Sequence, residues 1–369
     1  MFLRVFKKGI ITPAPGNCSV SREYAVSPHS SNSVAARKDS HRFCIAPMMD
    51  YTDRHCRYLM RLLTRHTRLY TEMVTAAAVV RGGNPRRFLA FDPFEQPLAL
   101  QLGGSDPAQL AQAAALAETW GYSEINLNVG CPSDRVTSGR FGACLMAEPA
   151  LVAECVQAMR DVVAIPVTVK TRIGIDDLDS DEHLDTFIGT VAAAGCETFI
   201  IHARKAWLHG LSPKENREIP PLNYGRVHKL KRSFPHLNIV LNGGLKSVAD
   251  AMAVLTAADG TTLDGVMLGR APYDAPYMLA EVDGVAFGDT ALLPGRAAVA
   301  AAYAGYAANV VAGGVRPHHV LRHMVGLFYG CANARLWRQT VARVGQSGAH
   351  PQELVTLAQQ LDERQALAA

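Results

Sequence analysis

The chain has 369 residues, of which 49% are hydrophobic, and a formal net charge of +4. A chain of this size and composition can bury a full core, which excludes disorder over most of its length and leaves room for one large domain and a smaller one. The small net charge does not by itself indicate a nucleic-acid partner. No apolar run reaches the roughly 18 residues of a membrane-spanning helix, so we expect no membrane association.

The cysteine pattern argues against a metal centre. None of the eight cysteines forms a Cys-x-x-Cys pair, so the spacing suggests neither a zinc site nor an iron–sulfur cluster, and we expect no metal. Free thiols are typical of the reducing cytoplasm, which is the location that we expect. We also expect the protein to be a monomer.

Residues 1–40 differ in composition from the rest of the chain. They contain Arg4, Lys7, Lys8, Arg22 and several serines, but few acids. This segment is interpreted as a disordered leader or extra residues upstream of the folded domain, with a transit-like peptide as the alternative. It is excluded from the fold prediction.

Short β-type runs recur from residue 43 onward, with helical segments between them. Eight such runs are found, over residues 44–48, 69–74, 98–103, 124–130, 166–172, 198–203, 238–242 and 265–269. Eight strands within about 230 residues predict an α/β fold of the (β/α)8 TIM-barrel type, over residues 41–285. An open doubly wound sheet is the alternative, but no Gly-x-Gly-x-x-Gly follows the first strand, which favours closure.

Helix signals stand between these runs. Ser105-Asp106-Pro107 opens an Ala-rich helix that should run to Trp120 and stop at Gly121. A second helix opens at Pro149, with one apolar stripe. Ser247 is a candidate cap for a helix that runs to about Ala258.

After about residue 285 the pattern becomes helical only and predicts a small helical domain over residues 286–369. The expected helices cover residues 292–311, 317–331, 333–344 and 351–366. Between Thr290 and Gln352 there is no Asp or Glu, while six arginines occur, at 296, 316, 322, 335, 338 and 343. Because this stretch has no acids of its own to pair with them, we expect an external polyanion as their partner.

The strand ends carry the candidate site residues. The first strand runs into Pro47, Met48 and Met49, soft apolar side chains against which a flat ring can lie. Gln101 is a polar residue in an otherwise apolar strand; its amide suits an imide edge, and a bond to nearby backbone is the alternative.

Two basic side chains occupy comparable places on the fifth and sixth strands. Lys170 is costly to bury in so apolar a strand unless it faces an electron-rich ligand at the barrel mouth. Alone, His202 would be interpreted as a core histidine, but a lysine on the neighbouring strand favours a role in the site.

Glycines follow the last two strands, as Asn242-Gly243-Gly244 and Gly269-Arg270. In (β/α)8 barrels the loops after strands seven and eight often bind phosphate through backbone N–H groups that glycine leaves accessible. Together the two runs predict a phosphorylated cofactor.

The fourth strand is followed by Gly130 and Cys131. Ile125, Leu127 and Val129 alternate with Asn126 and Asn128, and the turn at Gly130 places Cys131 at the strand end, where ligands of parallel α/β folds bind. A single cysteine is often an inert buried thiol, but this position favours a catalytic role.

These motifs, in this order, resemble the tRNA-dihydrouridine synthases. The matching runs are Ala46-Pro47-Met48, Asn128-Val129-Gly130-Cys131-Pro132, Lys170 with Arg172, His202-Ala203-Arg204, Asn242-Gly243-Gly244 and Gly269-Arg270. The resemblance covers about residues 43–345, and the segment 209–222 looks like that of the A-type enzymes, which act at positions 20 and 20a of the tRNA D-loop.

The resemblance implies an FMN enzyme that reduces the C5–C6 double bond of uridine in tRNA, with NADPH as reductant. It implies that FMN is bound by Pro47, Met48, Met49, Gln101, Lys170, His202, Asn242, Gly243, Gly244, Gly269 and Arg270. Cys131 would protonate C5, since a thiol with a reference pKa of about 8.5 is mostly protonated at neutral pH.

The expected tRNA contacts are Asn128 at the uracil edge, Arg172, Lys214 and Arg217 in the barrel, and Arg335 with Arg338 one helical turn apart. The target base must leave the RNA stack to reach the flavin.

Two other classes remain open. One is a flavin barrel that acts on a free pyrimidine or a dihydroorotate-like small molecule, and the other is a cofactor-bound RNA-binding protein without a main catalytic role. The acid-free helical stretch argues against the first, and the complete set of strand-end residues argues against the second.

Overall fold

The computed structural model describes residues 41–133, 139–347 and 351–366, and the segment 1–40, interpreted above as a leader, lies outside the described residues. In the described part of the chain, no helix is both long enough and apolar enough to cross a membrane.

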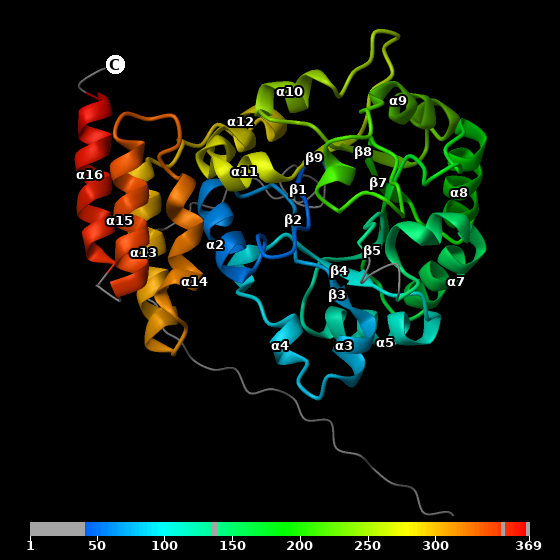
Figure 1. Ribbon diagram of the computed structural model, residues 1–369, viewed down its shortest axis with the longest axis horizontal. Coiled ribbons are helices and arrows are strands. Elements are labelled where there is room, and N and C mark those ends of the chain that lie inside the picture. Colours follow the sequence, from blue (N-terminus) through cyan, green and yellow to red (C-terminus); the bar gives the residue numbers. More distant parts are fainter. Residues whose placement is uncertain (1–40, 134–138, 348–350, 367–369) are drawn as a thin grey trace, which may run out of the picture.

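A parallel β-sheet forms the centre of the molecule, with helices around it (Figure 1). Its strands are β1 (Phe43–Ile45), β2 (Leu69–Tyr70), β3 (Val74–Thr75), β4 (Leu98–Gly103), β5 (Glu124–Val129), β6 (Val167–Arg172), β7 (Thr198–His202), β8 (Asn238–Asn242) and β9 (Gly265–Leu268). The strand order is β1-β9-β8-β7-β6-β5-β4-β2, and β3 also pairs with β4.

Backbone bonds close this sheet into a barrel. Ile45 donates its N–H to the Arg68 carbonyl at 3.0 Å, and Arg68 donates its own to Phe43 at 3.1 Å, which joins the first and second strands. The predicted (β/α)8 barrel is therefore confirmed. One detail differs, since the predicted strand 69–74 is two short strands, β2 and β3, that pair with opposite ends of β4.

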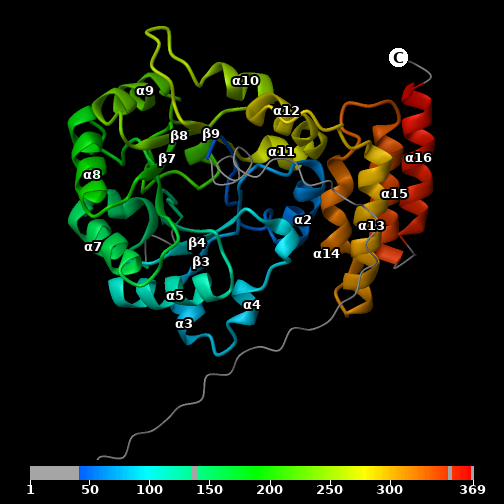
Figure 2. The same cartoon turned by 180° about the vertical axis from the view of Figure 1, so that it is seen from behind.

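Helices cover the outside of the barrel, as both views show (Figures 1 and 2). They are α2 (Arg54–Leu63), α3 (Ala76–Arg81), α4 (Arg86–Leu89), α5 (Pro107–Thr119), α7 (Pro149–Arg160), α8 (Asp181–Ala193), α9 (Tyr224–Ser233), α10 (Val248–Ala253), α11 (Arg270–Asp274) and α12 (Val282–Phe287), with the 3-10 helices η1 (Pro93–Glu95), η2 (Gly142–Ala147), η3 (Glu215–Arg217) and η4 (Pro276–Glu281).

The local signals explain where several helices begin. Asp106 accepts from the N–H groups of Ala108 and Gln109 and starts α5 as predicted. Ser247 caps α10, as predicted, by accepting from the Asp250 N–H, but that helix ends at Ala253 and not near residue 258.

The barrel interior has an apolar half and a polar half. Inward-facing residues of one half form a buried apolar cluster of Cys44, Ala46, Tyr70, Ala99, Ile200, Val240 and Met267, against which Met48 packs. On β4, β5 and β6 most inward side chains are polar instead, and five of these are buried: Gln101, Glu124, Asn126, Asn128 and Thr168. Bulky branched residues usually fill such a barrel, so this polar wall needs a separate explanation.

The C-terminal residues form a helical domain beside α2 (Figure 1). It consists of α13 (Arg296–Ala312), α14 (Pro317–Leu321), η5 (Arg322–Gly326), α15 (Ala334–Ser347) and α16 (Gln352–Ala366). The helix predicted over 317–331 is wrong in length, because the chain changes at Arg322 to a 3-10 helix that ends at Gly326.

Two sets of contacts attach this domain to α2. The rings of Tyr58 and Tyr306 stack with centroids 3.8 Å apart, and the Tyr303 hydroxyl donates to the His55 carbonyl at 3.1 Å. Asp53 accepts from the guanidinium of Arg322 at 2.8 Å and also pairs with His323. Burial alone would raise the pKa of Asp53, but His323 and Arg322 hold it below its ordinary range.

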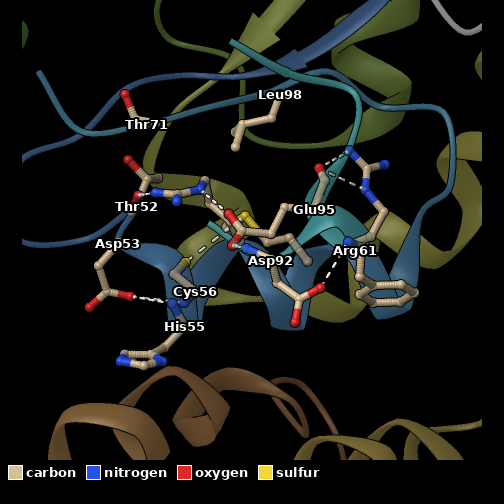
Figure 3. Close-up of polar contacts among 12 residues, drawn as sticks. Thr52, Asp53, His55, Cys56, Arg61, Thr71, Asp92, Glu95 and Leu98 are labelled. Atoms are coloured by element: carbon tan, nitrogen blue, oxygen red, sulfur yellow. Dashed lines mark hydrogen bonds and ion pairs between the residues drawn. The ribbon is translucent and has the colours of Figure 1, made fainter. Parts of the chain in front are cut away.

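The turn that contains Asp53, at the start of α2, also contacts the barrel. Figure 3 shows the start of α2, where Asp53 caps the helix through the N–H groups of His55 and Cys56. The buried guanidinium of Arg57 donates to Glu95 at 2.6 Å and to the Thr52 carbonyl at 2.7 Å. Thr52 in turn accepts from the Met48 N–H at 2.9 Å. The loop after β1 is therefore fixed between the barrel and the helical domain.

Candidate functional site

The strand register brings most of the predicted site residues together at the carboxyl ends of the strands. Asn128 on β5 is opposite Lys170 on β6. Arg172 is opposite His202 on β7, which is opposite Asn242 on β8. Since these strands are parallel neighbours, their inward side chains converge on one mouth of the barrel.

Cys131 stands at this mouth in a turn that Asn128 holds. The side-chain oxygen of Asn128 accepts from the N–H of Gly130 at 3.2 Å and from that of Cys131 at 3.0 Å. The thiol is partly exposed and lies 3.5 Å from the Ser133 hydroxyl. Asn128 is 8% exposed, so the structure gives it a role in placing Cys131; its predicted bond to the uracil edge stays a prediction.

Arg172 supports the same turn from β6. It is 4% exposed and donates to the carbonyls of Gly130 at 2.9 Å, Lys205 at 3.0 Å and Asn216 at 2.9 Å. A side chain buried in this way cannot serve as a surface contact for an RNA backbone. The predicted tRNA contact of Arg172 is therefore restricted to a base that enters beside Cys131.

Lys170 and His202 have strongly altered proton affinities. Burial and the nearby Arg172 lower the pKa of Lys170 to about 7, against an opposing effect of Cys131. Burial, with Arg172 and Lys170, lowers the pKa of His202 well below its usual range. In the described part of the chain Lys170 has no ion pair, so it is suited to an electron-rich ligand that would restore its charge.

Glycines form a backbone cradle after β8. Gly243 and Gly244 have φ of +114° and +75°, and a Cβ added to Gly244 would lie 2.4 Å from a methyl group of Leu222. Beside them the guanidinium of Arg204 donates to the Pro220 carbonyl, while its buried Nε has no hydrogen-bond partner among the described residues. Left-handed glycines, of which Gly244 is exposed, and a guanidinium N–H without a partner together fit a phosphate group.

The loop after β9 lies against the first strand. A Cβ on Gly269 would meet the Met48 sulfur at 3.6 Å, so Met48 covers this loop. Arg270 pairs with Glu218 at 2.8 Å, and both side chains are about half exposed. An exposed pair of this kind is weak, so Arg270 can exchange Glu218 for a phosphate.

These features fit FMN. The residues that would hold it are Met48 against the ring, Lys170 and Gln101 at the polar ring edge, and the two glycine loops with Arg204 and Arg270 at the phosphate. Gln101 already uses one N–H and one lone pair within the barrel, which leaves one of each for a ligand. Arg204 and Glu218 were not among the predicted site residues, although both lie in runs that resemble the family, His202-Ala203-Arg204 and segment 209–222.

Gly244→Ala is expected to abolish FMN retention during purification. The left-handed φ is strained for alanine, and its methyl group would displace Leu222 from the cradle. The flavin absorbance of the purified protein measures this.

Gly260→Ala is the matched control, because φ there is +84° but an added Cβ meets nothing within 4 Å. Equal flavin content in the two variants would reject the cradle at Gly244.

FMN affinity is expected to fall as the pH rises above about 7, the pKa of Lys170 in the ligand-free protein. Below that value Lys170 is already charged and FMN binds without proton uptake. Above that value Lys170 is neutral in the ligand-free protein and takes up one proton when FMN binds. The dissociation constant for FMN therefore rises by up to about tenfold per pH unit. Titrations of the apoprotein with FMN below and above pH 7 measure this. The same pH dependence in Lys170→Met would contradict it.

The helical domain leaves fewer arginines for a polyanion than the sequence indicated. Three of the six have partners in the chain: Arg322 pairs with Asp53, Arg343 with Glu353, and Arg296 lies over the Tyr277 ring at 3.6 Å. The argument that these three need an external partner is therefore wrong, because residues outside the acid-free stretch meet them.

Arg316, Arg335 and Arg338 are exposed and form no ion pair with any described residue. Arg338 also lines a cavity of about 340 Å³ between α11 and the helical domain, with Arg322, Tyr273 and Tyr329 among its other walls. Tyr273 contacts Tyr51, in the loop that continues Met48 and Met49, edge to face at 4.6 Å. Through this cavity, Arg338 is therefore linked to the loop after β1 at the barrel mouth. Lys214 and Arg217 are exposed in the loop after β7.

One group of metal-type ligands occurs among the described residues, formed by His66, Asp283 and Asp289. Asp289 accepts from Arg65 at 2.8 Å and pairs with His66 at 2.8 Å, and Asp283 accepts from the Arg65 N–H at 2.6 Å. The Arg65 cation thus already pairs with these carboxylates, which join α12 to the chain after α2.

Comparison with known proteins gives a consistent result. A family model described as "Dihydrouridine synthase (Dus)" matches residues 44–364. The Escherichia coli (strain K12) protein named "tRNA-dihydrouridine(20/20a) synthase" is 59% identical over 301 residues, which are 81% of this chain and 85% of that protein. Proteins of the same name from Shewanella oneidensis and Vibrio parahaemolyticus are each 56% identical, over 86% and 82% of this chain and 93% and 90% of their own lengths.

Proposed function

The chain belongs to the dihydrouridine synthase family, and from this we propose that it reduces the C5–C6 double bond of uridine at positions 20 and 20a of tRNA, with FMN as cofactor and NADPH as reductant. One observation carries the proposal: Cys131, the candidate acid, stands in a fixed turn at the strand end beside Lys170 and Arg172. In this proposal the enzyme acts in the cytoplasm, where tRNA functions, and acts as a monomer.

The barrel mouth holds the cofactor in this proposal. When bound, FMN supplies the hydride that reduces the base. Lys170 places a positive charge at the polar ring edge, the neutral His202 fills the space next to Gly243, and the two glycine loops with Arg270 take the phosphate. Pro47, Met48 and Met49 limit the ring side of the site, and Asn242 is fixed by donating to the Met267 carbonyl at 2.7 Å.

Cys131 acts as the general acid. Its S–H bond breaks and a C–H bond forms at C5 of the uracil, on the face opposite the cofactor. Asn128 holds the backbone of the Cys131 turn, and Arg172 fixes it through the Gly130 carbonyl. A proton donor placed by two buried side chains loses little freedom when the substrate arrives.

The tRNA lies across the barrel mouth and the helical domain. Arg335 and Arg338 meet the phosphate backbone from α15, and Lys214 and Arg217 meet it from the loop after β7. The target uridine flips out of the RNA stack to reach Cys131. These side chains are exposed and form no ion pair with described residues, which supports their assignment.

The experiment that tests the function is NADPH oxidation by the FMN-loaded enzyme with different acceptors. Unmodified tRNA transcript is expected to be reduced, whereas free uridine, uracil and orotate are not. Oxidation that a free pyrimidine supports as well as tRNA does would favour the alternative, a flavin dehydrogenase for small molecules. If none of these acceptors supports NADPH oxidation, both the tRNA function and the small-molecule alternative are rejected.

A further inference from the structure

A continuous chain of buried hydrogen bonds crosses the polar half of the barrel and ends at the Cys131 turn. Asn128 donates to Gln101 at 2.9 Å, Gln101 donates to Asn126 at 2.8 Å, and Asn126 donates to the Thr168 hydroxyl at 2.8 Å. Thr168 donates to Glu124 at 2.6 Å. Register explains the arrangement, since Gln101, Asn126 and Thr168 lie opposite one another on β4, β5 and β6.

Glu124 lies at the amino-terminal end of β5, away from the site. It is fully buried, and its carboxylate pairs with His41 at 2.7 Å and Arg68 at 3.3 Å and accepts from the Tyr70 hydroxyl at 2.9 Å. Burial would raise the pKa of Glu124, but His41 and Arg68 lower it to about 2. Glu124 is therefore a carboxylate that can only accept hydrogen bonds.

The groups at the two ends of this hydrogen-bond chain determine which partner donates and which accepts in every bond between them. At Glu124 the carboxylate accepts, so Thr168 must donate to it and accept from Asn126. At the other end the N–H groups of Gly130 and Cys131 can only donate, so Asn128 must present its oxygen to them. Reversing any amide would place oxygen against oxygen or N–H against N–H, and a buried mismatch of this kind is costly.

We propose that Glu124, acting through Thr168, Asn126 and Gln101, positions the Cys131 turn for proton donation. The role extends the function proposed above, because it assumes that Cys131 is the acid. Glu124 and Thr168 are positioning residues, which fix the orientation of the Asn128 amide without touching the substrate. This also accounts for polar residues in a wall that such barrels usually build from apolar ones.

Thr168→Val tests the proposal, because it keeps the shape of the side chain and removes its hydroxyl. We expect kcat for tRNA reduction to fall about tenfold with little change in KM, since the turn is misplaced but no RNA contact is lost. Iodoacetamide should alkylate Cys131 faster, by about threefold or more, since its turn is less firmly held. Cys144 and Cys331, also partly exposed, serve as references in the same molecule, read by peptide mass spectrometry.

Two further variants separate positioning from packing. Thr168→Ser restores the hydroxyl and should return both kcat and alkylation toward wild type. Thr171→Val removes a buried hydroxyl from the same strand. This hydroxyl donates to the Val129 carbonyl at 3.2 Å and is not part of the hydrogen-bond chain from Glu124 to Asn128. Cys131 alkylation should therefore be unchanged in this variant. Thr168→Ala, which also removes the hydroxyl, replaces Thr168→Val if that variant does not fold.

Unchanged alkylation and kcat in Thr168→Val, or no recovery in Thr168→Ser, would overturn the proposal. Alkylation does not require turnover. If wild-type enzyme fails to reduce tRNA while Thr168→Val still alters Cys131 alkylation, the function is wrong and the positioning chain stands.

Discussion

Cys131→Ala is expected to bind as much FMN as the wild type and to lose dihydrouridine formation by about a hundredfold or more in kcat. The methyl group keeps the turn, because Asn128 bonds to the backbone N–H of residue 131 and not to its side chain. What disappears is the proton for C5. Flavin absorbance and mass spectrometry of the tRNA product measure the two properties separately.

Cys144→Ala is the matched control. Its thiol is also partly exposed, lies on η2 close to the Cys131 turn, and donates to the Phe141 carbonyl at 3.2 Å. Turnover should remain near the wild-type rate in this variant. A normal rate in Cys131→Ala, or an equal loss in both variants, would remove Cys131 from the role of acid.

The double variant Arg335→Ala with Arg338→Ala is expected to weaken tRNA binding about tenfold or more and to leave FMN content unchanged. The two exposed guanidiniums lie one turn apart on α15 and form no ion pair with described residues, so their charge is available for phosphates. Loss of two phosphate contacts should reduce the slope of log Kd against log salt concentration by about two. Filter binding or fluorescence anisotropy over a salt series measures this.

Arg343→Ala provides the comparison on the same helix, since Arg343 is exposed but already paired with Glu353. It should change the affinity and the salt slope much less. Equal affinity of the double variant and the wild type at every salt concentration would reject α15 as an RNA-binding surface.

The barrel was predictable because strand and helix signals are local. Eight apolar runs, the Asp106 cap and the glycines after the last strands each specify their own structure over a few residues, and all agree with one topology. The split of the second strand and the early end of α10 depend on pairing with distant segments, which periodicity does not report.

The residues of the site could be predicted from the sequence, but the hydrogen bonds between them could not. Cys131, Lys170 and His202 were selected because polar residues at strand ends converge in a parallel barrel. That Asn128 holds the Cys131 turn, or that Glu124 ends a chain of amides, depends on register across three strands. The arginine argument failed for Arg322 and Arg343 for the same reason, because Asp53 and Glu353 lie outside the acid-free stretch and meet these side chains only in the fold.

The most direct test of the central claim is nuclease mapping and mass spectrometry of an unmodified tRNA transcript after incubation with the FMN-loaded enzyme and NADPH. The transcript must carry uridine at both positions 20 and 20a. We predict a gain of two hydrogens at each of these positions and at no other uridine, and no gain when Cys131→Ala is used. Reduction confined to other positions, or no gain in mass with an enzyme that retains its flavin, would contradict the account.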